Sequence, residues 1–281
     1  MAKKIVITSG KGGVGKTTIT ANLGLALSEL GARVLLVDID FGLNNLDVVL
    51  GLENKVCYNI GDVLSCRCRL KQALVQYGDK KSLYILPSLN GTETYSISGQ
   101  SIKLMLDSVD MFFDYIILDC PAGIDVGFHR AVSCANQAMV VVTPNLTSIR
   151  DADKVVSVLK SYRLDSINLI VNRARGDLIM SEKMMLPFDI EKILKTKLIG
   201  VLPEEDIVFL SSGYKISKKS DSFKAYKILA NNLHMGKSKI FDATKKYSGF
   251  FGSIRGSIKS RVWEKEKMKL LDCNLLLKMT E

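Results

Sequence analysis

The feature that most constrains this chain is a glycine-rich loop between a strand pattern and a helix pattern near its N-terminus. An apolar run over residues 3–8 leads into SGKGGVGKTT at residues 9–18, and an amphipathic pattern follows from residue 16. From Gly10 to Thr17 the loop fits G-x-x-x-x-G-K-[ST]. Glycines allow backbone N–H groups to turn inward around phosphate oxygens, and a helix that starts there directs its positive end at the same anions. The loop therefore predicts a strand–loop–helix unit that binds a nucleoside phosphate.

Side chains of this loop have distinct expected roles. We expect Lys16 to reach the β- and γ-phosphates and Thr17 to offer its hydroxyl to Mg²⁺, so that the cofactors are ATP and Mg²⁺. A second lysine, Lys11, stands between glycines, would extend away from its own nucleotide, and could reach one bound by another subunit. The expected ATP-binding residues of the loop are Gly10, Lys11, Gly12, Gly13, Val14, Gly15, Lys16, Thr17 and Thr18.

Short apolar runs alternate with longer helical patterns along most of the chain. Each run is almost continuously apolar, as expected for a strand that is buried on both faces. The strands are predicted at residues 3–8, 33–38, 83–87, 114–119, 138–143, 167–172 and 197–202. Helices are predicted around residues 16–30, 98–110, 127–136, 148–161, 179–195 and 221–235. This alternation predicts an α/β, three-layer P-loop NTPase fold with a mainly parallel sheet covered by helices on both faces.

Positive charge is concentrated near the C-terminus. Residues 215–269 contain 15 Lys and Arg against 4 Asp and Glu, whereas residues 1–214 contain 23 of each sign. An acidic partner, either an anionic membrane or a nucleic acid, is therefore expected at that end. The sequence shows neither a secretory signal nor a long apolar span, and its cysteines follow no framework of spacings, so we expect a cytoplasmic protein with reduced thiols.

Three acidic residues follow predicted strands close to the phosphate loop. Asp119 closes the run YIILD, which has the form of a Walker B strand, and is expected to hold Mg²⁺ directly or through water. Asp38 and Asp40 follow the second strand. Because parallel strands present their carboxyl ends at one edge of a sheet, these carboxylates are expected to meet beside the phosphates.

Several segments together resemble the MinD family of deviant Walker A ATPases, through about residue 235. The segments are GKGGVGKTT, VDIDFGLNNLDVVLGLENKV, YIILDCPAGID, IRDADK and LIVNRARGD. The resemblance implies two subunits that sandwich two ATP molecules. The alternatives within the same branch are a ParA-type DNA or cargo partitioning ATPase and a flagellar-number regulator. ParA-type proteins usually carry DxDPQ at the first switch, where this chain has DIDFGLNNLD.

The resemblance also implies roles that the sequence alone does not assign. Lys11 and Lys16 become catalytic, with Lys11 crossing the dimer interface and meeting Asp151. Asp40 orients the attacking water, and Asp38 joins Thr17 and Asp119 around Mg²⁺. The adenine would be contacted by Asn172 and covered by Pro203. In the segment at residues 143–153 this chain has Asn145 where the family normally has Glu, so a contact with the partner's ribose is weakened or replaced.

Apolar residues near the C-terminus recur at helical spacing. Residues 251, 254, 258 and 262 are separated by 3, 4 and 4 positions, which places them on one helical face beside basic residues. MinD proteins end in an amphipathic helix that binds membrane, and this spacing is what such a helix needs. A role in DNA binding is disfavoured, because phosphate contacts do not need a regular apolar stripe. The expected membrane-contacting residues are Phe250, Phe251, Ile254, Arg255, Ile258, Lys259, Val262 and Trp263.

The predicted organisation is therefore an ATPase domain over residues 1–235, a basic linker over 236–248, an amphipathic membrane-targeting helix over 249–263 and an extension of unassigned role over 264–281. By resemblance, the protein would be a slow ATPase that dimerises with ATP and is stimulated by dimerisation, by its partner and by the membrane. It would lie peripherally on the inner face of the cell membrane and position the division septum by recruiting a MinC-type inhibitor. A MinE-type regulator, or an adaptor to a polar scaffold, would set its location.

Overall fold

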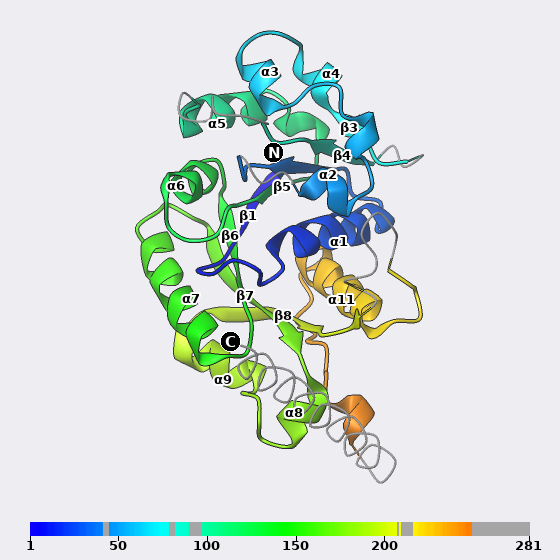
Figure 1. The fold of residues 1–281 in the computed structure, drawn as a ribbon, viewed down its shortest axis with the longest axis vertical. Coiled ribbons are helices and arrows are strands. Elements are labelled where there is room, and N and C mark those ends of the chain that lie inside the picture. Colours follow the sequence, from blue (N-terminus) through cyan, green and yellow to red (C-terminus); the bar gives the residue numbers. More distant parts are fainter. Residues whose placement is uncertain (42–44, 79–81, 90–96, 207, 209–215, 249–281) are drawn as a thin grey trace, which may run out of the picture.

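The computed structural model describes residues 1–41, 45–78, 82–89, 97–206, 208 and 216–248. In this part of the chain an eight-stranded sheet has the order β3-β4-β2-β5-β1-β6-β7-β8, and only the short β3 is antiparallel to its neighbour (Figure 1). The strands are β1 (Lys3–Thr8), β2 (Val34–Asp38), β3 (Val75–Gln76), β4 (Leu83–Leu86), β5 (Tyr115–Asp119), β6 (Gln137–Val142), β7 (Ser166–Ala174) and β8 (Lys197–Pro203).

The first strand lies in the middle of the sheet, between β5 and β6. The chain therefore builds outward on one side of β1 and later on the other, so that the strand order reverses at β1. In open α/β sheets of this kind, ligands bind beyond the carboxyl ends of the strands at the point of reversal. The glycine-rich loop after β1 occupies that point.

Helices cover both faces of the sheet and enclose two apolar cores. One core lies under α1 and α11 and contains Ile19, Leu23 and Leu229, while the other lies under α6, α7 and α9 and contains Phe128 and Val155. The helices described are α1 (Lys16–Glu29), α2 (Leu46–Val49), α3 (Ile60–Leu64), α4 (Leu70–Ala73), α5 (Gly99–Asp107), α6 (Val126–Ser133), α7 (Leu146–Leu159), α8 (Gly176–Met180), α9 (Pro187–Leu194) and α11 (Asp221–Met235). Single 3₁₀ turns occur at η1 (Glu53–Lys55), η3 (Asp110–Phe112) and η4 (Lys245–Tyr247).

The predicted fold class and all seven predicted strands are confirmed, most of them to within one residue. The single helix predicted over residues 179–195 is wrong. The chain forms α8 and α9 there, separated by a turn in which Glu182 has φ 58°. Pro187 begins α9, because a proline has no N–H to continue a preceding helix and suits a first helical position.

Residues 236–248, which the sequence predicted as a linker, lie against the ATPase domain, and we call them the strap. The side chain of Asn232 in α11 accepts a hydrogen bond from the Lys239 N–H at 3.1 Å and donates to the Lys239 carbonyl at 2.6 Å. It also donates to the Ile199 carbonyl of β8 at 3.0 Å. A Cβ added to Gly176 would lie only 1.9 Å from the Ala243 carbonyl oxygen, so the strap touches α8 directly.

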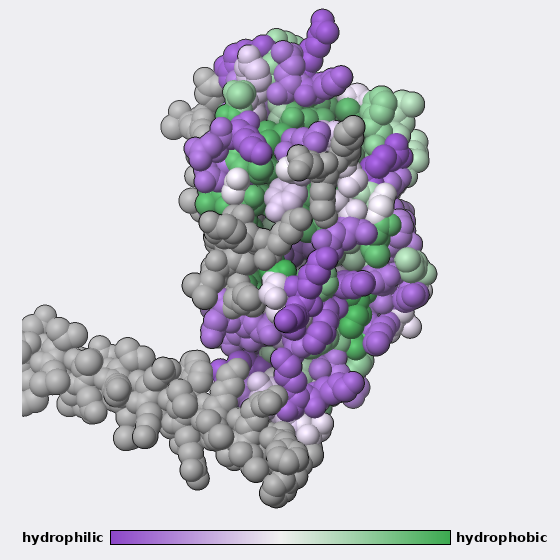
Figure 2. All heavy atoms as spheres, turned by 90° about the vertical axis from the view of Figure 1, so that its right-hand side faces the viewer, coloured by the Kyte–Doolittle hydropathy of each residue, from purple (hydrophilic) through white to green (hydrophobic). Residues whose placement is uncertain are grey.

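The lysines of α11 and the strap are all exposed. On the side of the molecule that lies to the right in Figure 1, hydrophilic residues predominate over the lower half of the surface (Figure 2). The lysines of residues 216–248 are Lys218, Lys219, Lys224, Lys227, Lys237, Lys239, Lys245 and Lys246. The predicted membrane-targeting helix (249–263) and the extension (264–281) lie outside the described residues, and the predicted domain boundaries stay predictions. In the described part of the chain no helix is both long and apolar enough to span a membrane.

Candidate active site

The phosphate loop has the backbone conformation that its glycines permit. Gly13 and Gly15 have φ of 74° and 97°, in the left-handed region that other residues rarely adopt. Gly15 is the N-cap of α1, so the first N–H groups of that helix face the end of the loop. Lys16, at the first position of α1, is 8% exposed. These features match the anion cradle that the sequence predicts.

Gly10 sets the distance between this loop and α7. A Cβ at Gly10 would stand 2.4 Å from the backbone carbon and oxygen of Asp151 and 2.7 Å from its Cβ, distances that real Cβ atoms do not show. The first glycine of the motif is therefore required by close packing against another helix. Asp151 lies beside the start of the loop for the same reason.

The two strand-end carboxylates meet at the centre of the sheet. In the register of the parallel pair β2–β5, Asp38 lies opposite Asp119, and their exposures are 1% and 2%. Asp38 accepts hydrogen bonds from the N–H groups of Asp40 at 2.9 Å and Leu46 at 3.3 Å. Asp119 accepts one from the Thr20 hydroxyl at 3.1 Å. The acidic pair is thus held by neighbours on α1, on α2 and in the loop between β2 and α2.

Burial and mutual repulsion make this pair hard to ionise. Burial, followed by the charge of Asp119, raises the pKa of Asp38 well above its usual range. Burial raises the pKa of Asp119 to about 6, although the Thr17 hydroxyl and the Lys16 ammonium oppose the rise. Two adjacent carboxyls with raised pKa values, next to a lysine, mark a candidate functional site.

A magnesium ion fits this set of donors. Mg²⁺ prefers oxygen ligands and is usually held by one or two carboxylates together with substrate phosphates and water. Asp38, Asp119 and the Thr17 hydroxyl supply such oxygens beside the phosphate loop. Within the described residues, no cluster of three or more His, Cys, Asp or Glu forms a complete metal cage.

Asp40 is half-buried and lies within electrostatic range of both Lys16 and Asp125. Burial raises its pKa, the Lys16 ammonium lowers it, and the Asp125 carboxylate raises it. Asp125 was not predicted as a site residue. It is the N-cap of α6 and accepts a hydrogen bond from the Phe128 N–H at 3.2 Å. An Asp three residues before the helix residue Phe128 is a capping signal, which the sequence contained.

Asn172 is fixed by a contact with the phosphate loop. Its side-chain amide donates to the Val14 carbonyl at 2.7 Å, and a Cβ on Gly15 would stand only 2.6 Å from the same nitrogen. The register of β7 against β8 shifts between Val171 and Ala174, and Arg173 has φ 58°. This local irregularity places Asn172 at the loop. The oxygen of the same side-chain amide can accept a hydrogen bond.

A pocket of about 140 Å³ lies next to Asn172. Pro203 lines it, and so do several residues that sequence reasoning did not single out, among them Glu205, Ser222 and Tyr226. The last two come from α11, far along the chain from the loop. The complete lining is Gly15, Thr18, Asn172, Arg173, Leu202, Pro203, Glu204, Glu205, Val208, Ser222 and Tyr226. We call it the base pocket, after the role proposed for it below.

The residues predicted for a dimer interface lie at the surface of the single chain. Lys11 is exposed, and its carbonyl accepts a hydrogen bond from the Ser9 hydroxyl at 2.8 Å. Asp151 is 35% exposed at its side chain and faces Lys154 at 3.9 Å. Asn145 caps α7, because its side-chain oxygen accepts from the Ser148 N–H at 2.9 Å. The Asn145 side chain thus serves as the N-cap of its own helix.

Comparisons with known proteins agree with this geometry. The family model described as "AAA domain" matches residues 2–174. A putative septum site-determining protein MinD from Guillardia theta is 46% identical over 75% of this chain and 79% of its own length. The MinD of the MinC:MinD cell division complex from Aquifex aeolicus is 43% identical, has a TM-score of 0.75, and corresponds over 85% of this chain and 98% of the other. MinD from Pyrococcus horikoshii, solved with Mg-ADP, is 32% identical with a TM-score of 0.75, covering 83% and 96% of the two chains.

Proposed function

Because the chain belongs to the MinD family of septum site-determining ATPases, we propose that it hydrolyses ATP at the loop after β1 and uses the cycle to recruit a division inhibitor to the membrane. The observation that carries the proposal is the buried pair Asp38 and Asp119 beside Lys16, at the mouth of a loop shaped by left-handed glycines. A phosphate chain would bring a magnesium ion, whose positive charge stabilises these two carboxylates.

Each part of the nucleotide has residues suited to it. The N–H groups of the loop and the start of α1 hold the phosphates, and Lys16 contributes its charge to the transferred group. Thr17, Asp38 and Asp119 hold Mg²⁺, which when bound neutralises charge on the phosphate oxygens. The amide oxygen of Asn172 accepts from the adenine amino group, and the base enters the base pocket.

Hydrolysis requires a water molecule in line with the terminal phosphate, and Asp40 is the residue proposed to orient it. The half-buried carboxylate lies within electrostatic range of Lys16, and the backbone of Asp40 is hydrogen-bonded on both sides of its Cα. Its N–H donates to Asp38, and its carbonyl accepts from the Ser88 hydroxyl at 3.1 Å. A carboxylate carried by a well-positioned backbone can orient water with little reorganisation, and such positioning is the main protein contribution to phosphoryl transfer.

Dimerisation is proposed to complete the site. Lys11 is exposed at the loop, and Asp151 lies beside Gly10, so each chain presents one group of the expected contact at the same surface. A second copy would bring its Lys11 to the phosphates of the first and add positive charge there. Turnover would then depend on association, and remain slow in the monomer.

Membrane recruitment is proposed to follow from the same association. One amphipathic tail over residues 249–263 is expected to bind anionic lipid weakly, and two tails on a dimer bind much better through effective concentration. A MinC-type inhibitor is the binding partner that we propose the dimer recruits, in line with the MinC:MinD complex of Aquifex aeolicus. A MinE-type or scaffold-linked regulator would determine where the cycle runs.

Phosphate release under saturating ATP and Mg²⁺ tests the active site. Lys16→Ala should abolish turnover, and Asp40→Asn should reduce it by about 100-fold or more, because the water is no longer oriented. Asp47→Asn is the matched control, since Asp47 is a half-buried Asp just beyond the same loop, in α2. Full activity in the Asp40 variant would remove its assigned role.

Sedimentation with anionic vesicles tests the membrane step. The full chain should bind in ATP and much less in ADP, and a chain ending at Ser248 should not bind in either. Binding that ignores the nucleotide would make the tail a constitutive anchor. If no binding occurs and DNA is retained with ATP instead, the partitioning class of the family becomes the better assignment.

A further inference from the structure

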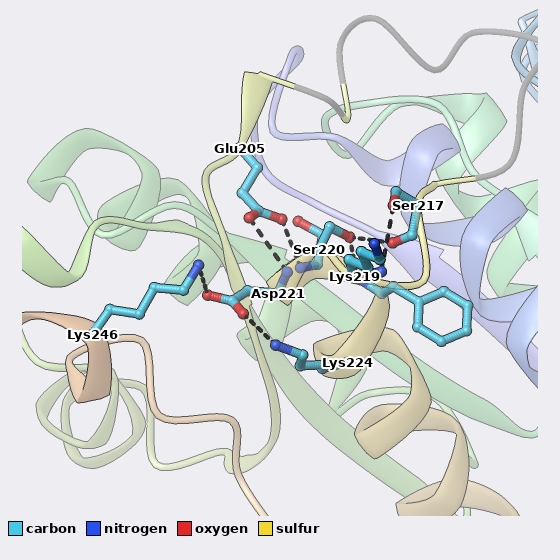
Figure 3. A network of polar contacts seen from close by, with 9 residues as sticks. Glu205, Ser217, Lys219, Ser220, Asp221, Lys224 and Lys246 are labelled. Atoms are coloured by element: carbon cyan, nitrogen blue, oxygen red, sulfur yellow. Dashed lines mark hydrogen bonds and ion pairs between the residues drawn. The ribbon is translucent and has the colours of Figure 1, made fainter.

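The base pocket is joined to the start of α11 by one carboxylate. Glu205 lines the pocket, and its two oxygens accept hydrogen bonds from the N–H groups of Asp221 at 3.3 Å and Ser222 at 2.7 Å (Figure 3). Helix N-termini carry free N–H groups and partial positive charge, so a carboxylate there is favourable. Glu205 therefore fixes the pocket rim to the helix whose side chains form the pocket wall.

The side chain of Asp221 extends this connection to the strap. It forms ion pairs with Lys224 of α11, at 3.0 Å, and with Lys246 of η4 (Figure 3). The Asp221 carboxyl is 12% exposed, whereas the Lys246 side chain is 50% exposed. Burial alone would raise the pKa of Asp221, but the hydrogen bonds from Lys246 and Lys224 outweigh it and lower the pKa. Asp221 is thus charged at neutral pH and bonded on both sides.

The residues around Lys246 make close contacts that hold this part of the strap against α8. Gly176 leaves room for the Ala243 carbonyl, and the same glycine lies against the ring of Tyr247, where an added Cβ would be 2.8 Å away. The Asp242 side chain accepts from the Thr244 N–H at 2.9 Å and orders the turn before η4. Lys246 is therefore presented to Asp221 from a segment that packs against α8.

We propose that Lys246 is a positioning residue of the base pocket, acting through Asp221 and Glu205, and that it links nucleotide binding to the strap from which residues 249–281 continue. The inference rests on the proposed ATP site. Nothing in the sequence pattern suggests the connection, since Lys246 and Glu205 are far apart along the chain. If the ion pair favours the nucleotide-bound arrangement of the rim, then the nucleotide favours the ion pair to the same extent.

The test compares Lys246→Gln with Lys246→Arg and Lys245→Gln. Lys245 is the adjacent exposed lysine of η4, for which the described structure gives no ion pair. In the full chain, the Gln variant at Lys246 should weaken ADP binding by about three- to fivefold, the scale of a partly exposed ion pair. KM for ATP should rise by the same factor with kcat little changed. The Arg variant should restore the affinity, and the Lys245 variant should match wild type.

Tripolyphosphate, which has no base, is the probe that separates positioning from general damage. Its inhibition constant for ATP hydrolysis should be the same in Lys246→Gln and wild type, because only the base pocket is affected. In the Asp221→Asn background, replacing Lys246 should change ADP affinity no further. Bound ADP should also slow amide exchange in residues 243–248 of wild type.

Two results would overturn the inference. Wild-type ADP affinity in Lys246→Gln would show that the ion pair does not act on the pocket. Equal losses of ADP and tripolyphosphate binding would show a general structural defect. If wild type itself binds neither ADP nor tripolyphosphate, the proposed ATP site fails, and that outcome is distinct from both.

Discussion

Replacing Asp119 by Asn is expected to stabilise the nucleotide-free protein while weakening Mg²⁺-dependent binding. The pKa of this buried carboxyl is about 6 in the fold against 3.8 for an ordinary Asp. At about 1.4 kcal/mol per pKa unit, ionising Asp119 above pH 6 costs the folded state at most about 3 kcal/mol. Asn carries no charge and keeps an oxygen for the Thr20 hydroxyl. The variant should therefore gain stability at pH 8, raising Tm by up to about 10 °C.

The pH dependence of stability tests whether the ionised Asp119 carboxylate destabilises the fold. A carboxyl whose folded pKa is raised destabilises the protein above that pKa, and the penalty vanishes as pH falls toward the unfolded value. The gain of Asp119→Asn over wild type should therefore be largest above pH 6 and shrink toward pH 4, in urea or thermal unfolding with a chelator present. Adding Mg·ADP should reverse the order, since only wild type keeps both carboxylates.

The matched control is Asp114→Asn, because hydrogen bonds from Arg33 lower the pKa of Asp114. The pKa shift of Asp114 is opposite in sign to that of Asp119. The Asp114→Asn variant should therefore lose stability at pH 8, by an amount that shrinks as pH falls. A nucleotide-free Asp119→Asn protein that is less stable than wild type at pH 8 would refute the electrostatic reasoning.

Three further perturbations have defined outcomes. Gly10→Ala forces a Cβ into the backbone of Asp151 and should abolish ADP binding, as measured by calorimetry, while Gly12→Ala, where the added Cβ would only reach the Ala122 Cβ at 4.0 Å, should retain more of that binding. Gly176→Ala would push the strap from α8 and should lower the free energy of unfolding by about 1–3 kcal/mol in urea. Asn145→Ala removes the cap of α7 and should lower the free energy of unfolding by about 1 kcal/mol. Asn145→Ser can still cap the helix and should retain most of that stability. Equal stability of the two variants would exclude a capping role.

The sheet and the phosphate loop could be predicted because their signals are local. Seven strands are buried on both faces, so each appears as a continuous apolar run, and the loop carries its chemistry in ten adjacent residues. The antiparallel β3 escaped prediction because it is only two residues long, Val75–Gln76. The acidic pair also followed from the sequence, since strand ends in a parallel sheet converge at one edge.

The remaining site residues depend on contacts between distant segments. Glu205 and Tyr226 join the base pocket only because α11 packs beside β8, and no local pattern marks that packing. The strap has a Lys-rich composition like that of a linker, yet Gly176, more than sixty residues earlier, provides the space that orders it. The capping role of Asp125 could be predicted from its position just before α6. Its effect on the pKa of Asp40, however, depends on how the fold brings the two residues together.

The clamp that Asn232 forms between β8 and the strap also bears on how copies of this chain can associate. An outermost strand with free carbonyls invites a further strand from another molecule, and such growth has no natural end. Here the Ile199 carbonyl is already bonded to Asn232, and the opposite rim of the sheet ends in the two-residue β3. Edge-to-edge addition is thereby discouraged on both rims. The dimer proposed above would instead use the surface around the phosphate loop, where pairing would be complete once two chains have joined.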